Sequence, residues 1–467
     1  MTAPTTMPKD LPRVISPFGA AAVMVGVIIG SGIFQTPPDI ARHLGSPWAV
    51  LGFWIAGGVL SLCGALTFAE LACMYPQSGG VYVFIRECYG RCAAFVFGWS
   101  YMLLIKPLAA GGIAVVFTSH LASLLRFALP HALPPEGQPL FPHDSEVITC
   151  TVLALLTWIN VRGVALGTRV AEFLTTIKFV AVAALVFLPL AAPGEIAHNF
   201  APGPAPGSFI QAIAPVLAGV LWTFDGWADV GAIAGEVKEP QKNLPRIYLL
   251  GTLAVTALYV AVNAALMMAM PLAQMRSVDS VAPFAFGKLI GPSAGAAVAA
   301  IVVLSTLGST HSSIMTGARV TFQQARDGLL FSPLGKVSGR ETPAVSLWVQ
   351  LVLSCAAVLF FKYFNALAGG YVFTIFIFYG LAAAALMVFR YSRPGVPRPF
   401  RVPGYPLVPL AFIVVSAGMT VLTILGDFAP DSKDRFASLR FLGIMALGVP
   451  AYFVWEWAKK RGSGRRT

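Results

Sequence analysis

Long apolar runs separated by short polar segments make up most of this chain of 467 residues. Each run holds about 20 residues or more, the length that an α-helix needs to cross the hydrocarbon core of a bilayer. The pattern therefore predicts an all-α protein with twelve membrane-spanning helices. The runs cover residues 15–42, 47–75, 90–123, 146–162, 168–193, 208–236, 246–270, 291–324, 343–361, 367–390, 406–426 and 437–458.

Composition agrees with this pattern. Hydrophobic residues make up 57% of the chain and charged residues 11%, and the mean hydropathy is +0.76. A soluble globule of this size needs more polar surface, so the chain is expected to lie in a lipid bilayer. Most of its 32 Lys and Arg residues fall in the loops and tails that share a side with the N-terminus. Because basic residues collect in cytoplasmic loops, both termini are predicted to be cytoplasmic.

The positive net charge of the chain is explained by its membrane topology. The net charge of +12 follows from the loop asymmetry and from attraction to anionic lipids, so no nucleic-acid partner is expected. The first 14 residues are polar and Pro-rich, and the first run lacks an A-x-A exit, which predicts no cleavable signal peptide.

Catalytic and metal chemistry find little support. None of the six cysteines lies in an outer loop, so no disulfide framework is expected, and no spacing suggests a zinc site. The six histidines are scattered, without a convergent acid–base cluster. We therefore expect no metal, no cofactor and no enzyme activity; a receptor or a channel stays open on composition alone.

The first run contains three glycines and a serine at bilayer depth, in residues 26–34 (GVIIGSGIF). Each glycine weakens a helix by about 0.5–1 kcal/mol relative to alanine. A broken helix that lines a binding site is one interpretation, because freed backbone groups are tolerated in a membrane only beside a cavity or a partner. The alternative is close helix packing, since Gly26 and Gly30 form a G-x-x-x-G motif.

The sixth run shows a similar irregularity at residues 221–229 (LWTFDGWAD). The second irregular run comes five positions after the first, which favours two inverted five-helix repeats followed by two further helices. The expected divisions are a cytoplasmic tail at 1–14, a first repeat at 15–193, a second at 208–390, two accessory helices at 391–458 and a basic cytoplasmic tail at 459–467.

Several motifs resemble those of the amino acid–polyamine–organocation (APC) superfamily, and three of them are similar to its L-type amino-acid transporter branch in prokaryotic form. The resemblance covers roughly residues 15–400 and implies a LeuT-like fold. The superfamily motifs are residues 26–34 (GVIIGSGIF), 68–71 (FAEL), 75–82 (YPQSGGVY) and 235–246 (GEVKEPQKNLPR), and those of the branch are 106–107 (KP), 224–227 (FDGW) and 325–328 (ARDG).

The resemblance also implies a substrate site at the two irregular helices. A helix N-terminus offers free N–H groups to a carboxylate, and a C-terminal end offers carbonyls to an ammonium. Ser31 and Gly32 would bind the substrate carboxylate, although Ser31 could instead serve packing alone. The carbonyls that would accept from the ammonium are those of Ile28, Trp222, Thr223 and Asp225.

Lys178 lies about ten residues into the fifth run, roughly 15 Å from the cytoplasmic end. A lone ammonium at that depth needs a partner, and intramembrane charges are functional candidates. By resemblance, Lys178 takes the place of the cation of sodium-coupled relatives and contacts Ser309 of the eighth run. The alternative is a tether between helices with no role in transport.

Other polar positions carry weaker predictions. Trp222 matches an aromatic gate of relatives but could equally be packing. The carboxylate of Asp225 is expected to cap a helix inside the break, and Lys106, before Pro107, to mark a structural kink. His311 is expected to be a neutral core histidine. Three acidic residues are expected to pair with basic loops: Glu70, Glu172 and Glu236.

The functional prediction is a sodium-independent exchanger of neutral L-amino acids, working by alternating access in a bacterial inner membrane. The pocket beside Trp222 and Ala228 is expected to lack a fixed anion aimed at the substrate side chain, so neutral substrates should outcompete lysine, arginine and putrescine. The alternatives are a proton- or sodium-coupled symporter and a cationic amino-acid or polyamine carrier. The outer loop at about 126–144 has no cysteine, so no disulfide-linked heavy chain is expected; substrate and bilayer are the expected partners.

Overall fold

The computed structural model describes residues 11–135, 138–191, 196–204, 207–278, 280–428 and 435–463. Within these ranges the regular elements are helical, and one isolated bridge joins Ile15 to Val237. Eleven helical stretches there are long and apolar enough to span a membrane, and the shorter apolar helix Phe209–Phe224 is a twelfth candidate. The predicted all-α membrane architecture is confirmed. Residues 1–10 and 464–467 of the expected tails lie outside the described ranges.

The first five spans are built from seven α-helices. The first span is divided into α1 and α2, and the third consists of α4, a π-helix and α5. The bounds are α1 (Pro17–Ile28), α2 (Gly32–His43), α3 (Pro47–Met74), α4 (Val81–Ser100), the π-helix η1 (Tyr101–Ile105), α5 (Lys106–Ala128), α6 (Asp144–Val161) and α7 (Val164–Ala184).

The later spans follow a similar order, with the sixth divided into α9 and α10. Short helices fill several connections between them. The bounds are η2 (Leu185–Ala191), α8 (Ile196–Asn199), α9 (Phe209–Phe224), α10 (Asp229–Ala232), η4 (Ala234–Glu236), α11 (Pro240–Ala269), α12 (Leu272–Met275), α13 (Val281–Leu289), α14 (Pro292–Arg326), η5 (Ser332–Gly335), α15 (Ala344–Phe361), α16 (Phe364–Ser392), α17 (Leu407–Asp427), α18 (Ala437–Ala446) and α19 (Gly448–Ser463).

The third span begins earlier than its expected start at residue 90. The helical stretch runs over Val81–Ala128, and Gly90 has a φ of 83° that kinks α4. The piece before Gly90 contains Arg86 and Glu87, and this polarity hides it from a search for apolar runs. The fifth span also ends earlier than residue 193, because α7 stops at Ala184 and a 3-10 segment containing Pro189 follows.

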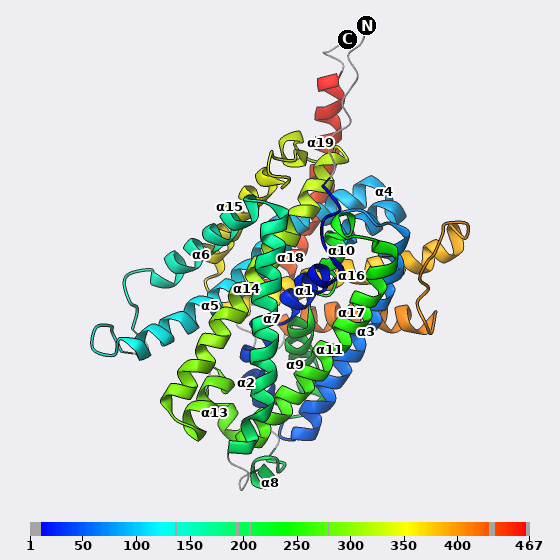
Figure 1. Cartoon of the computed structure of the whole chain (residues 1–467). Coiled ribbons are helices and arrows are strands. Elements are labelled where there is room, and N and C mark those ends of the chain that lie inside the picture. Colours follow the sequence, from blue (N-terminus) through cyan, green and yellow to red (C-terminus); the bar gives the residue numbers. More distant parts are fainter. Residues whose placement is uncertain are drawn as a thin grey trace.

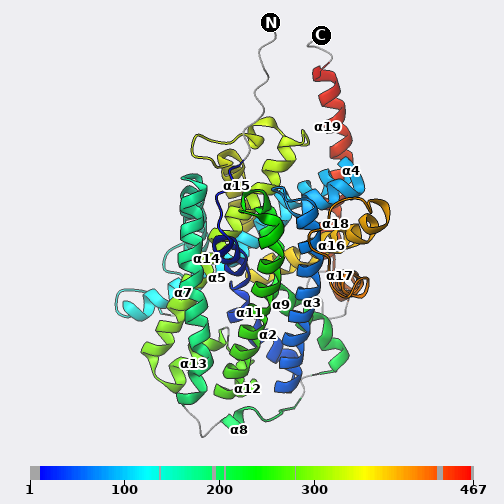
Figure 2. The ribbon, with the colours of Figure 1, turned by 45° about the vertical axis from the view of Figure 1, so that its right-hand side comes forward.

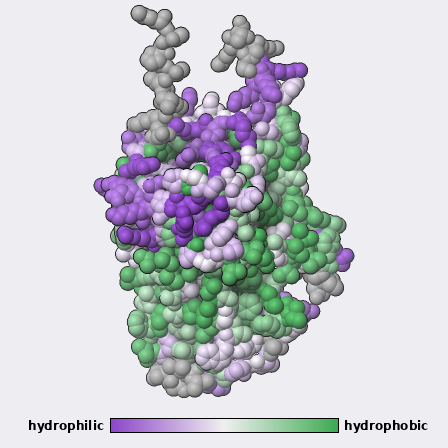
Figure 3. Space-filling model, turned by 90° about the vertical axis from the view of Figure 1, so that its right-hand side faces the viewer, coloured by the Kyte–Doolittle hydropathy of each residue, from purple (hydrophilic) through white to green (hydrophobic). Residues whose placement is uncertain are grey.

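The divided helices lie in the middle of the bundle (Figure 1). Helix α1 packs against α7, α10, α11 and α14, and α2 packs against α9. The described chain begins and ends toward the same end of the molecule, at the segment before α1 and at α19, whereas α8 and α13 lie at the opposite end (Figures 1 and 2). A hydrophilic cap covers the end that carries the termini, and a hydrophobic belt lies below it (Figure 3). This division fits a protein whose middle is surrounded by lipid.

Candidate functional site

The first break lies between α1 and α2. Helix α1 ends at Ile28, α2 begins at Gly32, and the intervening backbone turns so that the Gly30 amide donates to the Ile28 carbonyl at 2.8 Å. Close packing holds as well, because a Cβ atom on Gly26 would lie 2.5 Å from the Thr175 hydroxyl oxygen. The helix is therefore broken at this segment, and its glycines allow close packing; that the break binds a ligand stays a prediction.

Lys178 binds the carbonyls freed by this break. Its fully buried ammonium donates to the carbonyl of Gly26, to that of Ile29 at 2.8 Å and to the Ser309 hydroxyl at 2.9 Å. The hydroxyls of Ser305 and Ser309 also donate to the Ile29 carbonyl, at 3.1 and 2.8 Å. The contact between Lys178 and Ser309 is thus present in the structure, while its part in transport stays a prediction.

The second break lies between α9 and α10. Helix α9 ends at Phe224, and Gly226 has a φ of 118°, in the left-handed region that favours glycine. A Cβ atom on Gly226 would lie 2.9 Å from the amide nitrogen of Ile28. Glycine at this position therefore lets the two breaks meet backbone to backbone in the centre of the bundle.

Asp225 occupies the C-cap position of α9, but its carboxylate does not cap a helix, so the expectation for this carboxylate is wrong. Its carboxylate accepts hydrogen bonds from the hydroxyls of Tyr371 and Tyr379, the latter at 2.9 Å. Both tyrosines belong to α16. Hydroxyls from this distant helix therefore bind the carboxylate, in place of the backbone N–H groups that a capping carboxylate would bind. Sequence reasoning had no signal for this contact beyond the presence of aromatic residues in that run.

Lys106 is part of a buried ion pair. Its ammonium lies 2.7 and 2.8 Å from the two carboxylate oxygens of Asp229 and 3.4 Å from the Thr316 hydroxyl. The lysine stands at the junction of the π-helix with α5, before Pro107, so the expected irregularity is present there. Sequence reasoning missed Asp229 as the partner of Lys106. Asp229 is an acidic residue without an assigned role in the irregular sixth run, and this was a usable signal.

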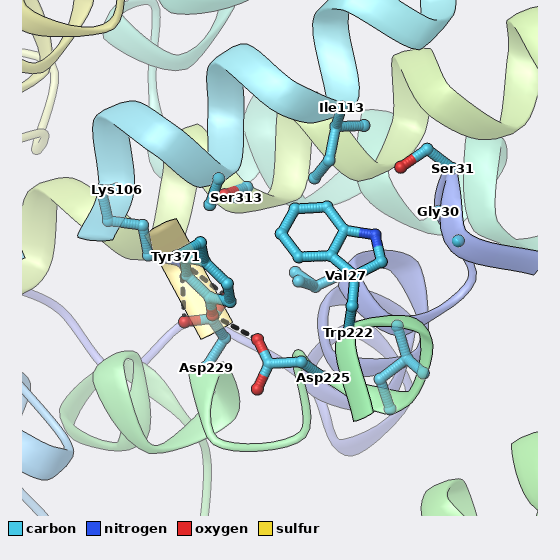
Figure 4. Close-up of a pocket in the computed structure, with 13 residues that line it drawn as sticks. Val27, Gly30, Ser31, Lys106, Ile113, Trp222, Asp225, Asp229, Ser313 and Tyr371 are labelled. Carbon is cyan, nitrogen blue, oxygen red and sulfur yellow. Dashed lines mark hydrogen bonds and ion pairs between the residues drawn. The ribbon is translucent and has the colours of Figure 1, made fainter. Parts of the chain in front are cut away.

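A small cavity of about 30 Å³ lies where the two breaks meet α5, α14 and α16. In Figure 4, Trp222 lies between Ser31 and Gly30 on one side and Lys106, Asp229 and Tyr371 on the other. The hydroxyl of Ser31 is buried without a hydrogen-bond partner, which leaves it able to donate to a ligand. The lining residues are Val27, Ile28, Gly30, Ser31, Gly32, Lys106, Ala109, Ile113, Trp222, Asp225, Asp229, Ser313 and Tyr371.

Two expected site residues have other contacts. Thr223 does not line the cavity. Its hydroxyl oxygen lies 2.8 Å from the hydroxyl oxygen of Thr36, and its hydroxyl donates to the Gly219 carbonyl at 2.8 Å. The Ile28 carbonyl lines it but already accepts from Gly30 and, at 2.7 Å, from the Tyr259 hydroxyl. An ammonium therefore has to displace one of those donors to bind the Ile28 carbonyl.

Two carboxylates line the cavity, whereas sequence reasoning had weighed only Asp225 there; the absence of an anion aimed at the substrate side chain stays a prediction. Asp225 and Asp229 both line the cavity, because the backbone turn after Phe224 directs this acidic stretch inward. The Trp222 ring packs edge to face on Phe364 and Tyr371, with centroid distances of 5.5 and 5.3 Å. This aromatic wall covers the cavity, and gating by Trp222 stays a prediction.

The remaining polar residues lie away from the cavity. His311 is buried, with Nδ1 3.2 Å from the Asn160 amide nitrogen and Nε2 2.8 Å from the Gly167 carbonyl, an arrangement that suits a neutral ring. Glu70 pairs with Arg390 at 2.6 Å, as expected of an acid near a basic loop.

Glu236 and Glu172, the other two glutamates expected to pair with basic loops, have different surroundings. Glu236 also has a basic partner, since its carboxylate lies 2.9 Å from Arg319, although this arginine stands within α14 rather than in a loop. The carboxylate of Glu172 lies beside Gly19, 2.7 Å from the position of a Cβ atom there.

A bundle of spanning helices with two central breaks and a charged cavity between them defines a membrane transporter of small molecules. A family model described as amino acid permease matches residues 15–447. The chain therefore belongs to the amino acid permease family and is a transporter rather than an enzyme.

Individual relatives are similar along nearly the whole chain. The large neutral amino acids transporter small subunit 2 of Mus musculus is 30% identical over 463 residues, which cover 96% of this chain and 83% of the relative. The b(0,+)-type amino acid transporter 1 of Homo sapiens is 28% identical over 468 residues, covering 98% and 91%. The Asc-type amino acid transporter 1 of Mus musculus is 28% identical over 457 residues, covering 95% and 81%.

Proposed function

We propose that this permease exchanges neutral L-amino acids by alternating access and does so without sodium. The observation that carries the proposal is the buried ammonium of Lys178, which donates to carbonyls of the first break and to Ser309. A lysine bound covalently to its helix cannot leave during the cycle as an ion does. The broken helix is therefore stabilised with or without sodium in the medium.

The substrate site in this proposal uses the two ends of the first break. The carboxylate of the amino acid binds the free hydroxyl of Ser31 and the amide of Gly32, at the N-terminus of α2. The ammonium binds carbonyls at Ile28 and at the end of α9, with the Asp225 carboxylate as the nearby counter-charge. These groups recognise what all α-amino acids share.

Binding requires the cavity to enlarge. A volume of about 30 Å³ is far below the roughly 300–1,000 Å³ of binding pockets. Trp222 and Tyr371 form the aromatic part of the wall. We propose that Trp222 moves to admit the substrate and returns to cover it.

The proposal also includes the setting of the protein. The end with both termini is cytoplasmic, because basic residues collect there, and the membrane is a bacterial inner membrane. Residues 15–193 and 208–390 form two inverted repeats around the breaks. No disulfide-linked heavy chain is needed, since the outer loop at about 126–144 offers no cysteine.

A second candidate function is favoured by one observation. Asp225 and Asp229 both line the cavity, with Lys106 as the lining cation. This excess of one carboxylate favours a cationic amino acid or polyamine, or a proton carried together with the substrate. Lys178 offsets the excess from the other side of the first break, which is why the neutral substrate ranks first.

Exchange in proteoliposomes tests both candidates. The vesicles are loaded with a labelled neutral amino acid. An unlabelled neutral amino acid, arginine or putrescine is then added outside, in sodium or choline buffer. We expect neutral amino acids to stimulate efflux most and the replacement of sodium by choline to leave the rate unchanged. A sodium requirement would overturn the role of Lys178, and stronger stimulation by arginine or putrescine would favour the second candidate.

A further inference from the structure

The segment that follows the second break is held against the rest of the protein along its whole length. We call residues 229–238 the gate segment; it contains α10 and η4. It begins at Asp229, which lines the cavity. It ends beside the residues before α1, where the Ile15 amide donates to the Glu236 carbonyl and the Lys238 amide donates to the Ile15 carbonyl, both at 2.9 Å.

Glycines allow the gate segment to pack without an intervening side chain. A Cβ atom on Gly80 would lie 2.9 Å from the Ala232 amide nitrogen, and one on Gly235 would lie 2.8 Å from that of Ser78. The Gly79 amide donates to the Ala232 carbonyl at 3.0 Å. Backbone contact at this distance leaves no room for water between the paired residues, and a void of only about 10 Å³ lies beside Gly79, Asp229 and Ala232.

Two buried ion pairs join the gate segment to neighbouring helices. Lys106 of α5 binds Asp229, and Arg319 of α14 binds Glu236 through two hydrogen bonds of 2.9 and 3.0 Å. The side chains of Arg319 and Glu236 are 1% and 0% exposed. Thr316, which contacts Lys106, lies one turn before Arg319 on α14. The two ion pairs therefore form successive layers, about 4.5 Å apart along that helix.

Buried ion pairs differ from apolar contacts in how they respond to opening. An apolar seal gains from excluding water and resists opening. A buried ion pair has already lost the hydration of both charges, and this loss roughly cancels their attraction. When the segment separates from α5 and α14, water returns to both charges. Ion pairs thus keep the closed and open arrangements close in free energy.

From these contacts we infer that Lys106 and Arg319 are positioning residues that hold the gate segment over the cytoplasmic side of the cavity and keep its opening reversible. The inference rests on the proposed function for its orientation and for alternating access. It assigns the Lys106–Asp229 and Arg319–Glu236 pairs to the balance between states, whereas substrate recognition belongs to the breaks themselves.

Opposite responses of single and double variants test this inference. In a background without the six native cysteines, Ser78→Cys would report on opening, because Ser78 is buried beside Gly235 and faces a cavity at the end with the termini. The readout is the rate of reaction with a membrane-impermeant maleimide added from the cytoplasmic side. It needs no substrate, so it is independent of which amino acid is carried.

Lys106→Met alone leaves Asp229 buried without its cation, and we expect the maleimide rate to rise about tenfold as Asp229 becomes hydrated. Lys106→Met with Asp229→Leu replaces the pair by apolar contact, and the rate should fall below that of the parent. If either variant fails to reach the membrane, Arg319→Met and Arg319→Met with Glu236→Leu give the same opposed pair of expectations.

The control is Glu70→Gln, which breaks another buried ion pair, with Arg390 of α16, that does not contact the gate segment. Its maleimide rate should match that of the parent. The inference is overturned if single and double variants shift the rate in the same direction, if neither shifts it, or if Glu70→Gln raises it as much as Lys106→Met. Loss of exchange in these variants with an unchanged maleimide rate would likewise contradict the inference. Sodium dependence of exchange would contradict only the proposed function.

Discussion

The two helix breaks look alike in sequence but are stabilised by opposite charges. At the first break, the ammonium of Lys178 binds freed carbonyls together with hydroxyls of α14. At the second, the carboxylates are bound by Tyr371, Tyr379 and Lys106. Glycine permits both interruptions, but the side chains from surrounding helices decide the electrostatic character of each.

The difference has a consequence for the substrate. Lys178 and Lys106 together carry two positive charges, and Asp225 and Asp229 carry two negative ones when all four are ionised. The region around the breaks is then neutral as a whole, with a cation beside the first break and the surplus carboxylate beside the second. A zwitterion, which is also neutral but charged at both ends, matches such a site without altering its total charge.

The largest expected effect comes from forcing the two breaks apart. A Cβ atom on Gly32 would lie 2.5 Å from the Thr223 hydroxyl oxygen and 2.7 Å from its Cα. Gly32→Val should therefore push α2 away from α9 and lower exchange of every substrate by about a hundredfold or more. Initial exchange rates in proteoliposomes measure this.

Gly52→Val is the matched control, because a Cβ atom there would meet nothing within 4 Å. It should exchange like the parent. Normal exchange by correctly inserted Gly32→Val would show that the breaks need not touch.

The next effect sharpens the role of charge at the first break. Lys178→Ala leaves the Gly26 carbonyl without its donor, at a cost of about 1–3 kcal/mol for a buried group left unsatisfied, while the Ile29 carbonyl keeps the hydroxyls of Ser305 and Ser309. The variant should reach the membrane but show an apparent affinity at least about tenfold weaker, because fewer molecules hold the binding-competent break.

Lys242→Ala, at an exposed lysine, controls for loss of a positive charge. Full activity of Lys178→Ala, measured by concentration dependence of exchange, would reduce Lys178 to a tether between helices.

A smaller effect is expected when the charge of the second break is removed but its shape is kept. Asp225→Asn still offers a carbonyl oxygen to Tyr371 or Tyr379, yet it no longer provides a counter-charge. We expect apparent affinity for neutral amino acids to fall about tenfold, as for loss of a hydrogen bond to a charged group.

Competition by arginine tests the same variant from the other side. Its inhibition should weaken at least as much as that of a neutral amino acid. The exposed Asp39→Asn serves as control. Unchanged affinities for both substrates would mean that Asp225 serves only to hold α16 in place through Tyr371 and Tyr379.

The smallest effect concerns the carbonyl shared by substrate and protein. Tyr259→Phe removes the hydroxyl that donates to Ile28, and one hydrogen bond contributes about 0.5–1.5 kcal/mol. If the substrate ammonium displaces this hydroxyl, the variant should bind substrate about two- to tenfold more tightly. Weaker binding would show that the hydroxyl positions the carbonyl instead. Tyr391→Phe, which changes an exposed tyrosine, should leave affinity unchanged.

Local sequence patterns determined much of the fold. Runs of about 20 apolar residues set the spans, because a helix of that length satisfies its own backbone in lipid. Glycines at bilayer depth located the first break, and an acidic residue beside Gly226 located the second. The depth of Lys178 identified it as a functional candidate from the sequence alone. These properties depend on residues that are near one another in the chain.

The tertiary structure decided which groups meet. Asp225 lies 146 residues from Tyr371, and Lys106 lies 123 residues from Asp229. A run of apolar residues specifies that a helix crosses the membrane, but its rotation and neighbours follow from the packing of all the helices together. For this reason the sequence indicated a helix cap for the Asp225 carboxylate and no partner for Lys106, whereas the packed bundle gave Asp225 two tyrosines and Lys106 the carboxylate of Asp229.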